Sequence, residues 1–175
     1  MYDIVEKEHE AYQPIFIYLS PHFTPNMFLK LKNYYKQTIP LIYEKNPQDH
    51  NLDKVIGMHD KIREIICSIR NTESPDIKST DEDTARIFEI NTKATIRTYK
   101  KIISLRNYDI DLKKRFIKFF SENRSFIETK KEMLDQCLKN PCESEMWMFC
   151  IQMCADNCDV EGEKFFAEKM SILNE

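Results

Sequence analysis

The chain has 175 residues, of which 42% are apolar, and a formal net charge of −3, which suits one domain with one hydrophobic core. It contains only two glycines, Gly57 and Gly162. This scarcity excludes all-β folds, which need glycine at turns, as well as phosphate-binding loops and dinucleotide folds, which need it for close backbone approach. We therefore expect an all-α protein with a single helical domain over residues 1–175.

The first two predicted helices lie in the amino-terminal part of the chain. Residues 3–19 are predicted to be helical, with a kink or break near Pro14, because proline lacks the amide hydrogen that an interior helical residue donates. Thr24 followed by Pro25 is typical of a helix start, with an N-cap residue before a proline at the first helical position. A second helix is therefore expected over residues 24–37.

Two further helices are predicted in the middle of the chain. Pro40 kinks or ends the second helix, and residues 46–50 form a turn. A third helix is expected over residues 51–70, because apolar residues recur there mostly at spacings of three and four. That stripe consists of Leu52, Val55, Ile56, Ile62, Ile65, Ile66 and Ile69. A loop over residues 71–79 precedes a fourth helix over residues 80–106, which starts with the hydroxyl and acidic residues of a helix cap.

The carboxy-terminal part is predicted to contain three more helices. The first covers residues 111–139 and has an inner apolar face that Asn123 and Lys130 interrupt. The other two cover residues 143–157 and 163–173, and the sequence shows no internal repeat. We expect a bundle of six to seven helices with long antiparallel central helices.

An aromatic stretch without charged residues runs from Ala11 to Leu29 and contains three prolines. These prolines exclude a continuous membrane-spanning helix. Two interpretations are open for its aromatic residues: they pack in the core, or they form a partly exposed apolar surface that contacts another protein. The candidate partner-binding residues of this stretch are Tyr12, Phe16, Tyr18 and Phe23.

A basic segment runs from residue 93 to residue 118 and carries a net charge of +7. Its candidate partner-binding residues are Lys100, Lys101, Arg106, Lys113, Lys114 and Arg115. One interpretation is a solvated face whose cations complement a helix dipole, and the other is a site for an anionic partner, including nucleic acid. The acidic pI of about 5.9 weighs against nucleic acid.

Five of the six cysteines lie between residues 137 and 158. The candidate metal ligands among them, for zinc or for copper(I) with nearby methionines, are Cys137, Cys142, Cys150 and Cys154. Their spacing differs from the tight pairs of structural zinc sites, and Cys150 and Cys154 share a helix face with Trp147, so core packing is favoured and no metal or cofactor is expected. Six cysteines in a chain without a secretory signal indicate the cytoplasm or another reducing intracellular compartment.

The histidines give little support to an enzyme. A di-iron bundle needs two Glu-x-x-His pairs, and only Glu6 and His9 form one. His59 lies on the apolar stripe of the third helix, where a hydrogen-bonded core residue, an acid–base group and a pH switch are all open interpretations. Cys67 follows His59 by eight residues, about 12 Å along one helix, which is too far for a cysteine–histidine pair.

The sequence favours a non-enzymatic helical protein that acts through protein–protein interaction, as an adaptor, a regulator or a host-interaction factor. It contains no catalytic motif, and it combines the aromatic stretch with the basic segment. Two alternatives stay open: a thiol- or metal-binding bundle that uses the carboxy-terminal cysteines, and binding of an anionic partner or nucleic acid through residues 93–118. No membrane span is expected.

Overall fold

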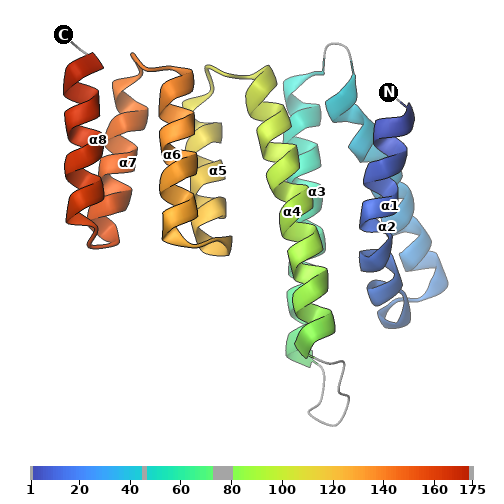
Figure 1. Cartoon of the computed structure of the whole chain (residues 1–175). Helices are drawn as coiled ribbons and strands as arrows, with labels where there is room; N and C mark the ends of the chain where they lie inside the picture. The colour runs from blue at the N-terminus through green and yellow to red at the C-terminus, as the bar shows by residue number, and fades with distance from the viewer. Residues whose placement is uncertain (1, 45–46, 73–80, 174–175) are drawn as a thin grey trace. The chain divides into compact units, whose positions relative to one another are not determined.

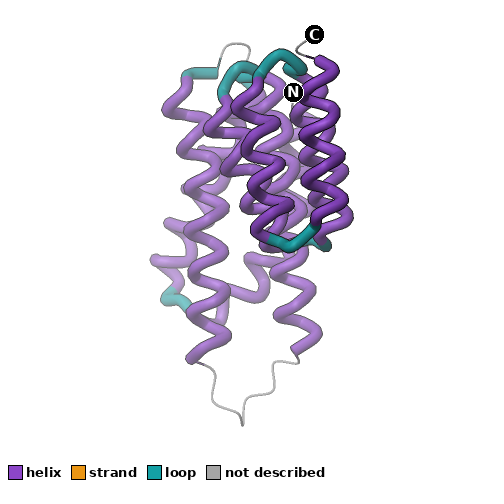
Figure 2. The backbone as a smooth tube through the Cα atoms, turned by 90° about the vertical axis from the view of Figure 1, so that its left-hand side faces the viewer, coloured by secondary structure: helices purple, strands orange, loops and turns teal. Residues whose placement is uncertain are grey.

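The computed structural model describes residues 2–44, 47–72 and 81–173, and every regular element in these ranges is helical (Figure 1). The ranges contain eight α-helices, two short 3-10 helices and no strand. Figure 2 shows only helices joined by loops in these ranges. The all-α prediction is confirmed, whereas the predicted count of six to seven helices is too low. Antiparallel packing of the long central helices stays a prediction.

The chain divides into two compact units, Met1–Ile102 and Ile103–Glu175. Each unit contains buried apolar side chains from several helices. The expectation of a single domain is not tested by this division and stays a prediction. No helix within the described ranges is long and apolar enough to cross a membrane.

The described part of the first unit contains six helical elements. They are α1 (Tyr2–Leu19), η1 (Ser20–His22), α2 (Pro25–Thr38), η2 (Ile39–Tyr43), α3 (Asp49–Thr72) and α4 (Asp81–Leu105), which continues into the second unit. α2 begins as predicted, because the Thr24 hydroxyl accepts a hydrogen bond from the Met27 amide and Pro25 is the first helical residue. α2 also ends before Pro40, which lies in η2.

α1 continues through Pro14, so the helix does not break there, and the alternative prediction of a kink stays a prediction. Four buried side chains flank this proline, with Tyr12 before it and Ile15, Phe16 and Leu19 after it. Their burial stabilises a continuous helix and offsets the backbone hydrogen bond that proline lacks.

The predicted third and fourth helices correspond to α3 and α4. α3 begins inside the predicted turn of residues 46–50, and residues 71 and 72, predicted to be loop, are its last residues. Residues 73–80, which contain most of the predicted loop and the predicted helix cap, lie outside the described residues. α4 ends one residue before the predicted end.

Aromatic rings fill much of the core of the first unit. The ring of Tyr12 stacks on that of Tyr35 with 4.3 Å between their centroids, and Phe16 meets Tyr35 edge-on at 5.3 Å. α3 contributes buried side chains at the predicted spacing, namely Leu52, Val55, Ile56, Ile62, Ile66 and Ile69. Ile65, the other residue of the predicted stripe, is only partly buried.

The second unit contains α5 (Ile110–Asn123), α6 (Phe126–Lys139), α7 (Ser144–Asp156) and α8 (Val160–Leu173). The prediction of one helix over residues 111–139 is wrong, because Arg124 and Ser125 have extended backbones and separate α5 from α6. The Ser125 hydroxyl accepts a hydrogen bond from the Glu128 amide, and the Glu128 carboxylate accepts one from the Ser125 amide. This capping box starts a new helix inside a continuous apolar pattern.

The helices of the second unit start at equal intervals, while the expectation of no internal sequence repeat stays a prediction. α7 begins 34 residues after α5, and α8 begins 34 residues after α6. Equivalent positions share burial or capping rather than residue identity: Lys113 and Trp147 are both buried, and the side chains of Ser125 and Asp159 both accept a hydrogen bond from an amide three residues later. Two-helix units that recur at this spacing are typical of helical repeat proteins.

Trp147 anchors the core of the second unit. Its indole N–H donates to the Pro141 carbonyl at 2.8 Å, and its ring lies 6.2 Å from that of Phe166. The buried cluster around it consists of Ile117, Met133, Cys137, Met146, Trp147, Cys150, Cys154 and Phe166. Sulfur-containing side chains therefore fill a large part of this core.

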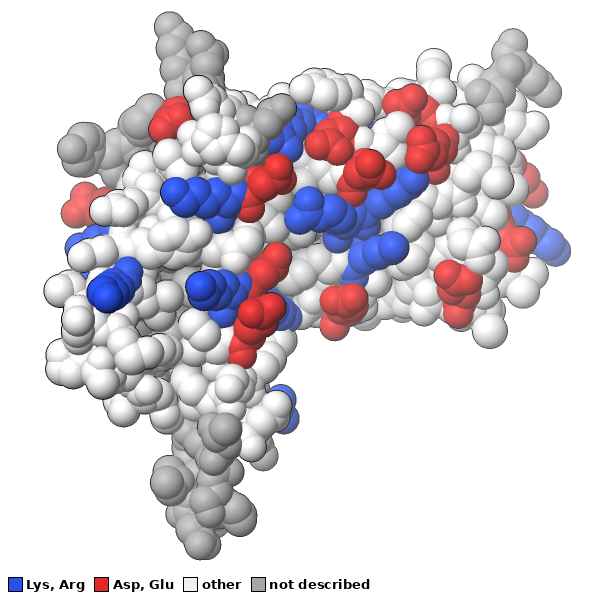
Figure 3. Space-filling model, turned by 180° about the vertical axis from the view of Figure 1, so that it is seen from behind, with Lys and Arg blue, Asp and Glu red and all other residues white. Residues whose placement is uncertain are grey.

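Charged side chains form pairs of opposite sign within each unit. In the first unit, Arg97 donates to both carboxylate oxygens of Glu8, at 3.1 and 2.8 Å. In the second unit, Lys114 Nζ lies 2.6 Å from Glu145 Oε1. On the face seen in Figure 3, acidic and basic side chains are interspersed, and broad areas between them carry no charge.

Candidate protein interface

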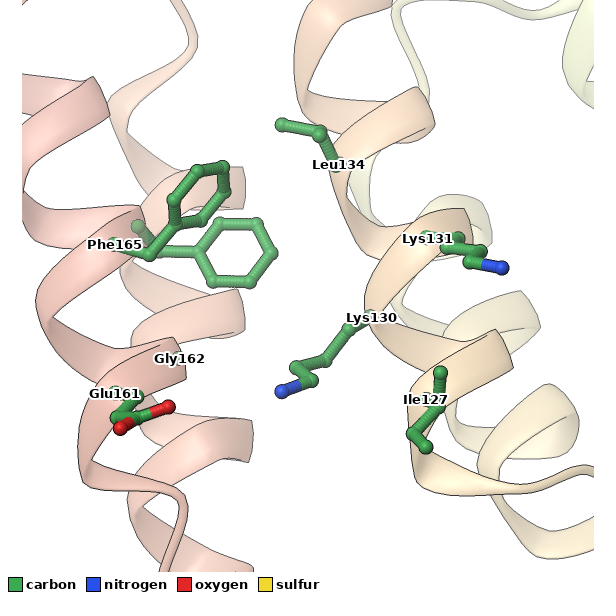
Figure 4. Close-up of a pocket in the computed structure, with 8 residues that line it drawn as sticks. Ile127, Lys130, Lys131, Leu134, Glu161, Gly162 and Phe165 are labelled. Carbon is green, nitrogen blue, oxygen red and sulfur yellow. The ribbon is translucent and has the colours of Figure 1, made fainter.

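A groove of about 460 Å³ lies between α6 and α8 of the second unit (Figure 4). Its lining consists of Ile127, Lys130, Lys131, Leu134, Glu161, Gly162, Phe165 and Phe166. The four residues of α6 have the i, i+3, i+4, i+7 spacing of one helix face, and the four of α8 form two adjacent pairs one turn apart. Each wall of the groove is therefore one face of a helix.

The corner between α7 and α8 sets the position of the second wall. Cys158, two residues after the end of α7, adopts a left-handed backbone conformation with φ of 56°. Its amide bonds to the Ala155 carbonyl, and the next amide, of Asp159, bonds to the Cys154 carbonyl. These two hydrogen bonds form a Schellman motif, which ends α7 and turns the chain into α8.

Asp159 links the start of α8 to α6. Its Oδ1 accepts a hydrogen bond from the Gly162 amide, and its Oδ2 lies 2.8 Å from Lys130 Nζ. In Figure 4 the Lys130 side chain points from α6 toward α8. This pairing lowers the pKa of Asp159 and raises the pKa of Lys130, so both groups are charged near neutral pH.

Gly162 allows α8 to pack closely on α7. A Cβ atom at this position would collide with the carboxylate of Asp159 and would lie 2.9 Å from the Cys154 sulfur. An added side chain would therefore displace the Asp159 carboxylate, which caps α8, or the Cys154 sulfur of α7.

Ile127 and Phe165 give the groove its exposed apolar surface. Ile127 is 68% exposed and Phe165 is 40% exposed, whereas the neighbouring Phe166 is buried. In Figure 4 the Phe165 ring points from α8 toward α6. Apolar surface in water is unfavourable by about 25 cal/mol per Å², so a partner that covers these side chains would gain free energy.

Charged side chains of opposite sign border the groove on its two walls. Lys131 lies on α6 and Glu161 lies on α8, and both are exposed. Opposite charges on opposite walls favour one orientation of a bound partner over the reverse.

The predicted partner-binding residues of the aromatic stretch have different environments. Tyr12 and Phe16 are buried in the core of the first unit, as in the core interpretation of this stretch. Tyr18 and Phe23 are partly buried, and the Tyr18 hydroxyl lies 3.4 Å from that of Thr84. A role for this stretch in partner binding stays a prediction, and the described surface offers Tyr18 and Phe23 for it.

The predicted residues of the basic segment are divided between the two units. Lys100 and Lys101 belong to the first unit and lie on α4, where Lys100 is exposed. Arg106 and Lys113 belong to the second unit and are buried, and burial lowers the pKa of Lys113.

Among the predicted residues in the second unit, Lys114 and Arg115 on α5 are more accessible than Arg106 and Lys113. Lys114 is partly buried and pairs with Glu145, whereas Arg115 is exposed. Binding of an anionic partner through residues 93–118 therefore stays a prediction that rests on only part of the original set.

The carboxy-terminal cysteines are mostly core residues. Cys137, Cys150 and Cys154 are buried, and the sulfurs of Cys137 and Cys150 lie 3.6 Å apart. A hydrogen bond with Cys137 and burial raise the pKa of Cys150, and burial raises that of Cys154 to about 11, so both are neutral thiols near pH 7. Cys142 is exposed, and within the described ranges no group of three or more His, Cys, Asp and Glu side chains could hold a metal ion.

His59 is buried in a hydrogen-bond network of the first unit. Its Nδ1 lies 3.3 Å from the Tyr12 hydroxyl oxygen, and its Nε2 lies 3.0 Å from that of Thr98. Burial, and then the charge of Arg97, lower the pKa of His59 to about 3, so the imidazole is neutral. These surroundings favour a structural role over acid–base chemistry.

The groove residues carry no role in the sequence analysis. The sequence predicts one helix over residues 111–139. It therefore does not show that residues 127–134 belong to a separate helix, α6, which forms one wall of the groove. The available signal was a pair of apolar residues, Ile127 and Phe165, that lie beside the buried stripes of their helices. Recognising them as one site requires the placement of α8 against α6.

No protein-family model, no curated protein and no solved structure matches this chain. The function of the groove therefore has to be argued from its own residues.

Proposed function

We propose that this protein is not an enzyme and acts by binding another protein, as an adaptor, a regulator or a host-interaction factor. The observation that carries the proposal is the groove between α6 and α8, where Ile127 and Phe165 expose apolar surface. Exposed apolar surface bordered by charged residues is typical of protein–protein contacts. The groove therefore joins the aromatic stretch and the basic segment as a candidate contact surface.

The chemistry of the groove supports binding rather than catalysis. Its lining contains no histidine, cysteine or hydroxyl side chain, and Glu161 is its single carboxylate. The Lys130 ammonium pairs with Asp159, which raises its pKa and keeps it protonated, so it is a poor nucleophile. These residues lack the nucleophile and base that acyl or phosphoryl transfer requires.

The cytoplasm or another reducing compartment is the proposed location. The chain carries six cysteines, and the thiols of Cys142 and Cys158 are exposed. Exposed thiols oxidise or cross-link in oxidising surroundings, so this distribution suits a compartment that keeps thiols reduced.

Substitutions in the groove test the proposed function. Phe165→Glu and Ile127→Glu each place a carboxylate on an apolar wall, while Met148→Glu is the matched control, because Met148 is an exposed apolar residue of α7 outside the groove. Tagged whole chains capture proteins from an extract of the cells that contain this protein. Each captured protein is then purified, and its dissociation constant for the four chains is measured by calorimetry.

The expected result is a partner whose binding weakens at least about 10-fold, or about 1.4 kcal/mol, with either groove variant. The Met148→Glu chain should bind it within about 2-fold of wild type. Circular dichroism confirms that all variants are folded. If no captured protein distinguishes the groove variants from the control, the groove is not the contact surface.

A further inference from the structure

We infer that the occupant of the groove is an amphipathic α-helix of the partner protein, an inference that rests on the proposed function. The helix lies along the groove and buries apolar residues at positions i, i+3 or i+4, and i+7. The shape of the walls, their hydrogen-bonding groups and their charges each point to this occupant.

The residues that line each wall are spaced by whole turns of a helix. On α6 the lining runs from Ile127 to Leu134, a distance of two turns or about 10 Å. On α8, Phe165 follows Glu161 by about one turn. A third helix presents apolar side chains at the same one-turn spacing, so its ridge of side chains matches a groove between two helices.

Most of each wall offers no backbone groups to an extended peptide. From Thr129 onward the amides of the α6 wall bond within the helix or to its cap carbonyl, and the Glu128 and Gly162 amides bond to the cap side chains of Ser125 and Asp159. The described part of the second unit also has no strand edge. An extended segment would leave buried N–H and C=O groups unpaired, whereas a helix satisfies them internally.

The charges on the walls fix the direction of the helix. Lys131 on α6 and Glu161 on α8 border the apolar surface, while Lys130 is already paired with Asp159. A helix with acidic residues on the flank facing α6 and basic residues on the flank facing α8 meets opposite charges on both sides. Reversing the helix would place like charges together, which disfavours that orientation.

Selection from a displayed library of random peptides, each about five helical turns long, tests the occupant. The library is selected on the whole chain and counter-selected on the Phe165→Glu variant, so the peptides that survive need the groove. The expected survivors have apolar residues at i, i+3 or i+4, and i+7, with acidic and basic flanks. Synthetic survivors should gain helical circular dichroism on binding, and a central proline should weaken them at least about 10-fold.

Three variants serve as controls for this selection. Ile127→Glu changes a more exposed residue than Phe165→Glu and should reject the same peptides, which guards against an unfolded Phe165→Glu chain. Lys131→Glu should change the preferred charge on the flank facing α6 from acidic to basic. Met148→Glu should leave the selected sequences unchanged.

The outcomes separate the inference from the proposed function. Survivors that are proline-rich or lack helical periodicity overturn the helical occupant, but they still depend on Phe165 and so support the groove as a contact surface. A library without any Phe165-dependent peptide also overturns the helical occupant. The proposed function is decided by the captured whole proteins, so each can fail alone.

Discussion

A directed series of hydrogen bonds crosses the core of the first unit at the residue scale. Arg63 Nη1 donates to Asn91 Oδ1 at 3.2 Å, and Asn91 Nδ2 donates to the Tyr12 hydroxyl at 2.7 Å. The Tyr12 hydroxyl can then donate to His59 Nδ1, and His59 Nε2–H to the Thr98 hydroxyl. In this arrangement His59 Nδ1 carries no proton, so the network suits the neutral imidazole.

The first unit is predicted to lose stability as the pH falls below 6.5. The pKa of His59 is lowered from 6.5 to about 3 in the folded chain, by burial and then by Arg97. The unfolded chain therefore binds a proton between pH 6.5 and 3 that the folded chain does not bind. The contribution of His59 to the free energy of unfolding is fully present above pH 6.5, and it falls by about 2 kcal/mol between pH 7 and pH 5.

Urea unfolding at pH 7 and pH 5, with wild type and His59→Gln, measures this effect. Glutamine does not titrate, so the pH dependence of every other group cancels when the two chains are compared. Between pH 7 and pH 5 the free energy of unfolding of wild type should fall by about 2 kcal/mol more than that of His59→Gln. A difference that is the same at both pH values would mean that the pKa of His59 is the same in the folded and unfolded chains, and would contradict the lowered pKa.

Helix starts were predictable at the scale of the elements where local signals agree. The start of α2 was predicted because the cap residue Thr24 and the first helical residue Pro25 point to the same place. The start of α6 was missed although Ser125 and Glu128 form a capping box, because the apolar pattern continues across it. The equal spacing of the helix starts in the second unit was not visible in the sequence, because the positions 34 residues apart share burial or capping rather than residue identity.

The two glycines are predicted to respond to alanine in opposite directions. At Gly162 a Cβ atom meets the cap residue Asp159 and the Cys154 sulfur, so Gly162→Ala should lower the free energy of unfolding by about 1–3 kcal/mol. At Gly57, which is exposed inside α3, no atom lies within 4 Å of the added Cβ. Gly57→Ala should therefore raise the free energy of unfolding by about 0.5–1 kcal/mol.

Urea unfolding of the two glycine variants beside wild type measures both changes, and each serves as the control for the other. Because the substitution is identical, a general effect of alanine on helix formation would stabilise both variants. Stabilisation by Gly162→Ala would contradict the close packing of α8 on α7.

Fold class was predictable at the scale of the whole molecule, and the candidate site was not. Two glycines and periodic apolar residues suffice to indicate helices, because both are local properties of the chain. The same apolar residues do not reveal which of them face a core: Tyr12 was a surface candidate and is buried, while Ile127 was unassigned and is exposed. Lys113 shows the same limit for charge, since its burial depends on packing between helices.

The whole chain is expected to unfold in a single cooperative transition. α4 runs without interruption from the first unit into the second, and a unit of about 70 residues has only a small core of its own. Trp147, the single tryptophan, reports the second unit, so Ile62→Ala in the core of the first unit tests the coupling. This variant should lose about 2–5 kcal/mol, and the urea midpoints from Trp147 fluorescence and from circular dichroism should fall together. Ile117→Ala makes the matched change in the core of the second unit. If the urea midpoint from Trp147 fluorescence falls with Ile117→Ala and not with Ile62→Ala, the two units are independent domains.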